Sequence, residues 1–174
     1  MGFLLRGFAG HPLHPALTDV TIGLYTFAAG AAILSRLGVS DENLATAWWL
    51  ALVGGLIVTV PTALTGFADW LVIRRGTALW RTATLHLSAM LTATVVFGIT
   101  AGAGHADYVD RAVSGGALLL TLIGYGVMAL GGWLGGAIVF VHGMRVLNLV
   151  EEPTARAISP APSPEKEEAE RSSS

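Results

Sequence analysis

Histidines and carboxylates in apolar surroundings are the residues of this chain that could do chemistry. His14, His86 and His142 stand inside or at the edge of long apolar stretches, and Asp19 and Asp69 lie within two of them. Imidazole binds haem iron or a small metal ion, and a carboxylate behind a ligating imidazole fixes its orientation. Ionisable groups at membrane depth are costly and usually functional, so these side chains form the candidate site.

Four apolar stretches are long enough to position these residues across a membrane. The chain has 174 residues, of which 53% are hydrophobic and 13% charged, whereas about 25% of an average soluble domain is charged. A helix needs about 20 apolar residues to cross the hydrocarbon core. The predicted spans are approximately residues 15–34, 45–73, 82–103 and 112–141. Pro61 predicts a kink or tilt in the second span.

The segments between these spans are short, which favours antiparallel neighbours. We therefore predict an all-α fold, an integral membrane up-down four-helix transmembrane bundle, over residues 1–150. Residues 151–174 are rich in Ser, Pro and Glu, and their low apolar content predicts a disordered tail.

The arginines predict the orientation of the bundle. One side carries a group of arginines, namely Arg6, Arg74, Arg75, Arg81 and Arg145. The other side carries only Arg36 and Arg111, beside several acidic residues. The positive-inside rule then places the arginine-rich side and both termini in the cytoplasm. The candidate site lies at that cytoplasmic end.

The segment HPLHP, residues 11–15, predicts the start of the first helix. A residue before proline avoids the α region, and proline suits the first helical position. We therefore expect the helix to begin at Pro15, with His14 in its cap region. His11 is expected to face water or lipid headgroups.

Depth in the bilayer separates the candidate residues. At about 1.5 Å per residue, Asp19, Asp69 and His86 should share a depth of roughly 7–8 Å inside the arginine ring. His14 and His142 should lie nearer the interface, whereas His105 falls on the opposite side of the membrane and is expected to be a loop residue.

Each of these residues also has a purely structural interpretation. His86 could form a hydrogen bond across helices to Asp69 or a threonine, and Asp69 could pair with Arg74 or Arg75. His142 could interact with the dipole at a helix C-terminus.

The segment GGWLGG, residues 131–136, contains two overlapping small-xxx-small pairs. These glycines predict close helix packing, and the alternative interpretation is that they leave room for a flat cofactor.

The order HPLHPALTD…IGL, PTALTGFADW, a histidine early in the third span and GGWLGG…HG resembles a bacterial membrane family, domain of unknown function 2231. The resemblance covers roughly residues 10–146 and departs from the family pattern at Thr21, where relatives often carry proline. It implies a multi-pass four-helix protein of the bacterial plasma (inner) membrane, with no established reaction. Some relatives are joined to, or encoded near, Rieske-type iron–sulfur proteins, and the arrangement resembles small b-type cytochromes. The resemblance thus implies electron transfer with a Rieske-type or other redox partner.

The first functional hypothesis is a b-type-haem-binding electron-transfer subunit. In an up-down bundle the first and third helices are diagonally opposite, which favours His14 and His86 as the axial pair, with His142 in reserve. Nearby arginines could pair with the haem propionates, and the candidates are Arg74, Arg75 and Arg81. Asp19 and Asp69 would stand behind the ligating imidazoles.

Two alternatives stay open. His14, His86 and His142 with Asp19 or Asp69 could hold a small metal ion such as zinc or iron. The cluster could equally tie helix ends together in a membrane scaffold or a proton relay without a cofactor. The chain contains no HExxH, GxSxG, P-loop or dinucleotide motif, and we expect no stand-alone enzyme. It has no cysteine and no basic stripe for nucleic acid, and its oligomeric state is left open.

Overall fold

The computed structural model describes residues 11–146 together with residues 154 and 158, and the elements in this part of the chain are helices. They are α2 (Leu13–Arg36), α3 (Asp41–Leu71), α4 (Ala78–Ala103), α5 (His105–Val109), α6 (Gly115–Gly136) and the π-helix η1 (Ala137–Val141). Four candidate membrane spans are long and apolar enough to cross a bilayer: α2, α3, α4, and α6 continued by η1. The predicted all-α membrane fold is confirmed. Arg6 and most of the predicted tail at 151–174 lie outside the described residues.

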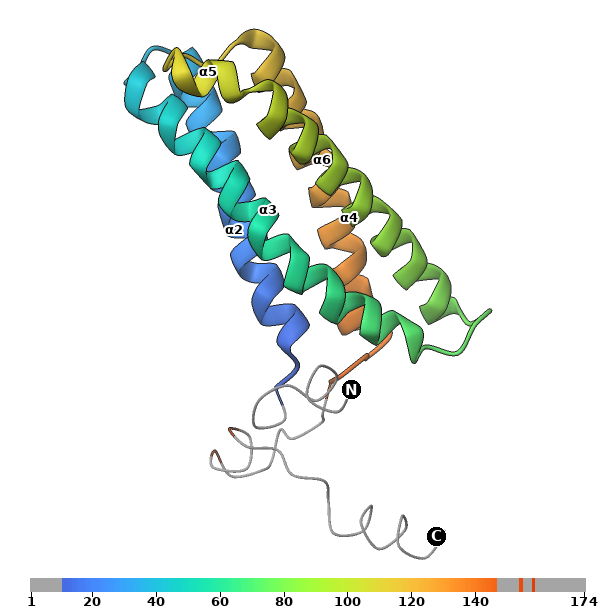
Figure 1. Cartoon of the computed structure of the whole chain (residues 1–174). Helices are drawn as coiled ribbons and strands as arrows, with labels where there is room; N and C mark the ends of the chain where they lie inside the picture. The colour runs from blue at the N-terminus through green and yellow to red at the C-terminus, as the bar shows by residue number, and fades with distance from the viewer. Residues whose placement is uncertain (1–10, 147–153, 155–157, 159–174) are drawn as a thin grey trace, which may run out of the picture.

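The long helices form two hairpins that pack side by side (Figure 1). α2 packs chiefly against α3, and α4 packs chiefly against α6. Weaker packing joins α2 to α6 and α3 to α4, so α2 lies diagonally opposite α4. This is the predicted up-down bundle, which the short connections enforce.

The two ends of the bundle differ in the elements that form them. We call the end where α2 begins, α3 ends and α4 begins the histidine end. The opposite end, which carries the short helix α5 and lies at the top of Figure 1, is the far end.

The start of α2 differs from the prediction. The helix begins at Leu13 after Pro12, so His14 lies in the first turn and not in a cap before Pro15. Proline is tolerated in a first turn because the first N–H groups of a helix need no partner within it. The proline pair therefore fixes the approach to α2 without delaying its start.

The other helices also extend past their apolar stretches. α3 begins at Asp41 and continues through Pro61 to Leu71 as one helix. α4 begins at Ala78, where the hydroxyl of Thr77 accepts a hydrogen bond from the N–H of Trp80 at 3.1 Å. Helices cross the polar layer of a bilayer as well as its hydrocarbon core, so their ends lie beyond the hydrophobic stretches.

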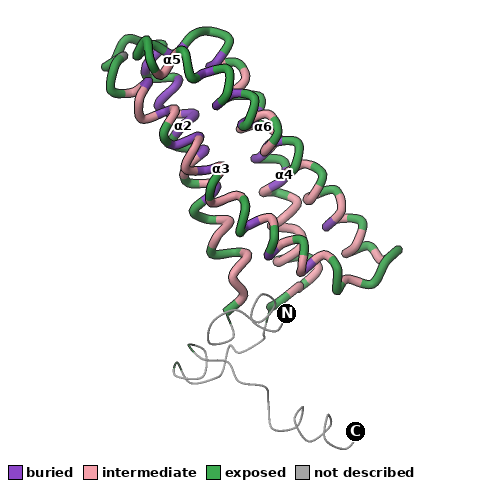
Figure 2. The backbone as a smooth tube through the Cα atoms, in the orientation of Figure 1, coloured by how far each residue is buried: buried purple, intermediate pink, exposed green. Residues whose placement is uncertain are grey.

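The most closely packed part of the core lies toward the far end. Tyr25 and Phe97 stack with ring centres 3.9 Å apart, and Trp48 donates a hydrogen bond to the hydroxyl of Thr121 at 3.0 Å. A Cβ atom on Gly55 would lie 2.6 Å from the ring of Tyr25, so only glycine fits there. Figure 2 shows the buried segments gathered in this half of the bundle.

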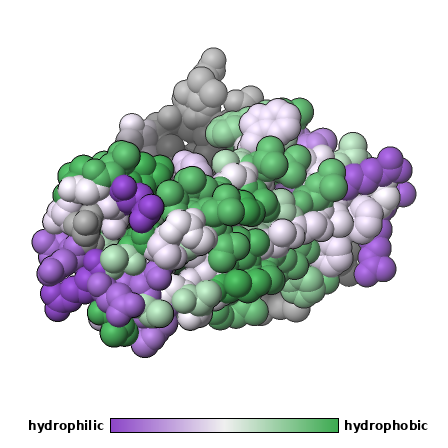
Figure 3. All heavy atoms as spheres, turned by 90° about the horizontal axis from the view of Figure 1, so that it is seen from above, coloured by the Kyte–Doolittle hydropathy of each residue, from purple (hydrophilic) through white to green (hydrophobic). Residues whose placement is uncertain are grey.

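The outer surface is that of a protein in lipid. Large apolar side chains on all four long helices are exposed, for example Phe27, Ile57, Val95 and Leu119. Figure 3 shows apolar side chains across the middle of one face, with hydrophilic side chains gathered toward its edges. This distribution matches a hydrocarbon core bounded by two polar layers.

Candidate functional site

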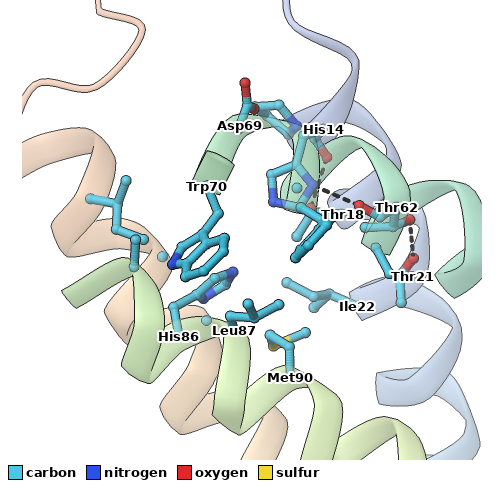
Figure 4. Close-up of a pocket in the computed structure, with 18 of the residues that line it drawn as sticks. His14, Thr18, Thr21, Ile22, Thr62, Asp69, Trp70, His86, Leu87 and Met90 are labelled. Atoms are coloured by element: carbon cyan, nitrogen blue, oxygen red, sulfur yellow. Dashed lines mark hydrogen bonds between the residues drawn. The ribbon is translucent and has the colours of Figure 1, made fainter. Parts of the chain in front are cut away.

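A cavity of about 310 Å³ lies between the two hairpins in the half of the bundle toward the histidine end. Residues from α2, α3, α4 and the α6–η1 segment line it. His14 and His86 enter it from the diagonally opposite helices α2 and α4 (Figure 4). We call it the histidine cavity.

His14 is held against α3 by its Nδ1 atom, which lies 3.0 Å from the carbonyl oxygen of Thr62. A carbonyl can only accept, so Nδ1 carries the hydrogen and donates it. The ring lies against Gly66, where an added Cβ would come within 2.6 Å of the imidazole Cε1. A glycine at that position is therefore required for the ring to occupy this place.

The depth of His14 differs from the prediction. Thr62 and Gly66 lie roughly 8–14 Å along the helix axis from Leu71, at about 1.5 Å per residue. α2 thus begins well inside the end of α3, and its first turn already lies level with the interior of the bundle. His14 consequently reaches His86 and does not stay at the interface.

His86 is held against α6 in the same way. Its Nδ1 atom donates to the carbonyl oxygen of Gly131 at 2.7 Å. The ring lies beside Gly135, where an added Cβ would come within 3.1 Å of its Cε1. The GGWLGG segment thus provides close packing for α4, as predicted, and the place for this ring. Gly132 and Gly136 of the same segment line the cavity directly.

The two imidazoles form a perpendicular pair. Their ring centres are 6.4 Å apart and the planes are inclined at 82°. Each Nδ1 donates to a backbone carbonyl, so a neutral ring keeps an Nε2 lone pair for a ligand. Within the part of the chain that the structure describes, no hydrogen bond engages either Nε2 atom.

An ion pair lies beside the histidines at the mouth of the cavity. Arg145, which follows η1, places its Nη2 atom 2.6 Å from Oδ1 of Asp69 on α3, and both residues line the cavity. The expected partners Arg74 and Arg75 are exposed in the α3–α4 turn and do not form this pair. The prediction was wrong because it considered only arginines near Asp69 in sequence.

Asp19 lies on α2 and lines the cavity with an exposed side chain. Among the described residues no hydrogen bond joins Asp19 or Asp69 to a histidine, so the predicted arrangement of a carboxylate behind each imidazole is not present.

The remaining histidines do not join the pair. His142 lies just after η1, with its Nε2 atom 3.1 Å from the hydroxyl of Thr82, and it does not line the cavity. His105 packs beside Trp49 at the far end, with ring centres 5.4 Å apart. His11 is exposed.

The three-histidine metal site is not assembled in this structure. Within the described ranges, no three His, Asp or Glu side chains come together closely enough to hold a metal ion. The cavity instead offers two imidazole ligands and one cation, Arg145.

A family model described as a predicted membrane protein (DUF2231) matches residues 10–148. The chain belongs to this family. The match covers every residue that lines the histidine cavity. Comparisons with curated proteins and with solved structures gave no match. Membership therefore brings the membrane fold and no activity.

The segments that carry the family resemblance meet at the cavity. HPLHP supplies His14, TGFADW supplies Gly66, Asp69 and Trp70, and GGWLGG supplies Gly135. These segments are separated by long stretches of sequence, yet each faces the same space.

Sequence reasoning missed Arg145 as a cavity residue. Arg74, Arg75 and Arg81, the predicted partners of an anionic group, are exposed and do not line the cavity. The available signal was position, because Arg145 directly follows the fourth span at the end where the second span finishes.

Proposed function

We propose that this protein is a b-type-haem-binding electron-transfer subunit with His14 and His86 as the axial ligands. The observation that carries the proposal is the perpendicular imidazole pair, whose ring centres are 6.4 Å apart. Two imidazoles on opposite sides of one iron, each bound through Nε2 at about 2 Å, have ring centres about 6 Å apart. The measured separation fits that requirement.

The hydrogen bonds of the two rings support the same proposal. Ligating imidazoles commonly donate their other N–H to a carbonyl or carboxylate, which fixes the tautomer and makes the ligand more basic. The carbonyls of Thr62 and Gly131 accept the Nδ1 hydrogens of His14 and His86. Both rings are thereby held with Nε2 available for a metal.

Room for a macrocycle comes from the seam between the hairpins. The cavity of about 310 Å³ is small for a porphyrin, so binding requires the hairpins to separate slightly. The weaker packing of α2 on α6 and of α3 on α4 permits that movement without breaking either hairpin. Gly132 and Gly136 line the cavity and add no side chain that would obstruct a flat ligand.

Arg145 is the residue suited to an anionic group of the ligand. It lines the cavity and uses Nη2 for Asp69, which leaves other guanidinium donors for a carboxylate. It replaces Arg74, Arg75 and Arg81 as the proposed partner of the propionates.

When bound, the haem would supply one-electron transfer, and the protein residues would hold it and exclude water. We place the histidine end at the cytoplasmic side of the bacterial plasma membrane, because Arg74, Arg75, Arg81 and Arg145 lie there. A Rieske-type or other redox protein is the proposed partner. A reporter fused after Ser174 tests the orientation, and a periplasmic signal would reverse it.

Absorption spectroscopy tests the proposal directly. The protein is expressed with excess haem, purified in detergent, and measured oxidised and after dithionite reduction. We expect a Soret shift with α and β bands in the wild type, and loss of these bands in His86→Ala and His14→Ala. His105→Ala is the matched control, because His105 lies at the far end, and it should keep the bands.

A colourless wild-type protein would overturn the haem proposal, as would His86→Ala with unchanged bands. Elemental analysis of a colourless sample would then test for a small metal ion. A protein without haem or metal would leave a scaffold or proton relay.

A further inference from the structure

A groove on the lipid-facing side of the bundle leads into the histidine cavity. It lies in the seam between α3 and α4 and has a volume of about 430 Å³. Six of its lining residues also line the histidine cavity: Thr59, Ala63, Phe67, Leu87, Leu91 and Thr94. The two spaces therefore adjoin, and a molecule in the groove would border the interior beside the imidazole pair.

The groove opens at mid-depth in the membrane. Thr59 lies roughly 18 Å along α3 from Leu71, near the middle of a hydrocarbon core about 30 Å thick. Leu64 and Leu91 flank the groove and are 61% and 52% exposed, so its mouth faces lipid. An occupant would enter from the bilayer and not from water.

The lining of the groove restricts the chemistry of the occupant. No charged side chain lines it. A phosphate or carboxylate head is too costly to bring to this depth without a cation, so phospholipid and fatty-acid head groups do not fit. An uncharged polar head attached to an apolar chain fits.

Two threonine hydroxyls set the hydrogen-bonding character of the site. Thr59 donates to the carbonyl of Gly55 at 2.8 Å, and Thr94 donates to the carbonyl of Met90 at 2.8 Å. Each hydroxyl hydrogen is therefore used, and each oxygen retains a lone pair that can accept. The groove favours an occupant with hydroxyl donors, and the ring of Phe67 offers a surface for stacking.

We propose that the α3–α4 groove binds an isoprenoid quinol, with its dihydroxy ring near Thr59 and Thr94 and its chain along the seam toward lipid. The oxidised quinone has only acceptor oxygens, so it should bind more weakly than the quinol. This binding site goes beyond the haem proposal and requires none of the proposed haem ligands.

Equilibrium titration of the purified protein in detergent tests the proposal, with a short-chain ubiquinol and the matching ubiquinone as probes. We expect the wild type to bind the quinol roughly tenfold more tightly than the quinone. Ala63→Trp fills the groove and should weaken quinol binding by at least roughly tenfold. Ile57→Trp is the matched control, since Ile57 is exposed on the same helix outside the groove, and it should bind like the wild type.

Thr94→Val provides a second variant that keeps the side-chain volume and removes the accepting oxygen. It should bind quinol and quinone with nearly equal affinity. Equal affinities in the wild type, or wild-type binding by Ala63→Trp, would overturn the proposal. So would displacement of the quinol by a phospholipid at equal concentration. Spectra of the same samples report haem separately, so loss of haem with retained quinol preference sinks only the haem proposal.

Discussion

The two halves of the bundle use the same four helices in different ways. Toward the far end, Tyr25, Trp48 and Phe97 are almost completely buried and fill the space between the hairpins. Toward the histidine end, the hairpins enclose a cavity of about 310 Å³ beside His14 and His86. One half is a closely packed core and the other is a lined space.

The difference separates stability from function. Membrane helices associate through close packing, because lipid is as apolar as their side chains. The far half supplies that packing, with glycines that admit each large ring, such as Gly55 for Tyr25 and Gly124 for Phe97. The histidine half lacks such filling, so its residues can change without loss of the fold.

The largest stability effect is expected where the far half is opened. Trp48→Ala removes a fully buried indole and its hydrogen bond to Thr121, and it should destabilise the protein by about 3–5 kcal/mol. Denaturant unfolding in detergent, followed by circular dichroism, measures the change. Trp133→Ala is the control, because Trp133 is 76% exposed, and it should have little effect. Equal losses in both variants would contradict the contrast between the halves.

A smaller stability effect with a large ligand effect is expected where the cavity is closed. Gly66→Leu would occupy the place of the His14 ring and should cost about 1–3 kcal/mol through overpacking. Under the haem proposal, retained haem per protein should fall about 10- to 100-fold. The Soret absorbance per mole of protein measures it. Gly23→Leu is the control, since an added Cβ there meets nothing within 4 Å, and a parallel loss of haem in this control would refute the assignment.

The smallest effects are expected at the ion pairs of the two ends. The side chains of Arg145 and Asp69 are 34% and 13% exposed, whereas those of Arg111 and Glu42 at the far end are 63% and 72% exposed. Asp69→Asn should destabilise by about 1 kcal/mol, and Glu42→Gln by less than about 0.5 kcal/mol. Chemical unfolding at low and high salt compares them. A larger loss in Glu42→Gln would reverse the ranking.

The fold was predictable because membrane spans are set by length and hydropathy. Those properties predicted four spans and an up-down order, and the order predicted that His14 and His86 approach from diagonal helices at one end. The resemblance to domain of unknown function 2231 was also confirmed. The start of α2 was misplaced because a helix accepts proline in its first turn.

The polar contacts of the site were less predictable. The pairing of Asp69 with Arg145 depends on how α3 and the segment after η1 meet, and no sequence spacing encodes that meeting. The carbonyl partners of the histidines, Thr62 and Gly131, are backbone atoms and leave no signature in side-chain type. Helix register and rotation, rather than composition, decide these contacts.

The π-helix Ala137–Val141 gives the end of α6 one residue more than an α-helix would need. The N–H of His142 bonds the carbonyl of Ala137 at 3.0 Å, the five-residue step of such a turn. Deleting one residue here would restore regular winding and rotate all that follows by about 100° about the helix axis. Arg145 would then leave Asp69 and the cavity mouth, while every hydrophobic position before Ala137 kept its place. A single-codon deletion could thus separate the membrane scaffold from its binding chemistry.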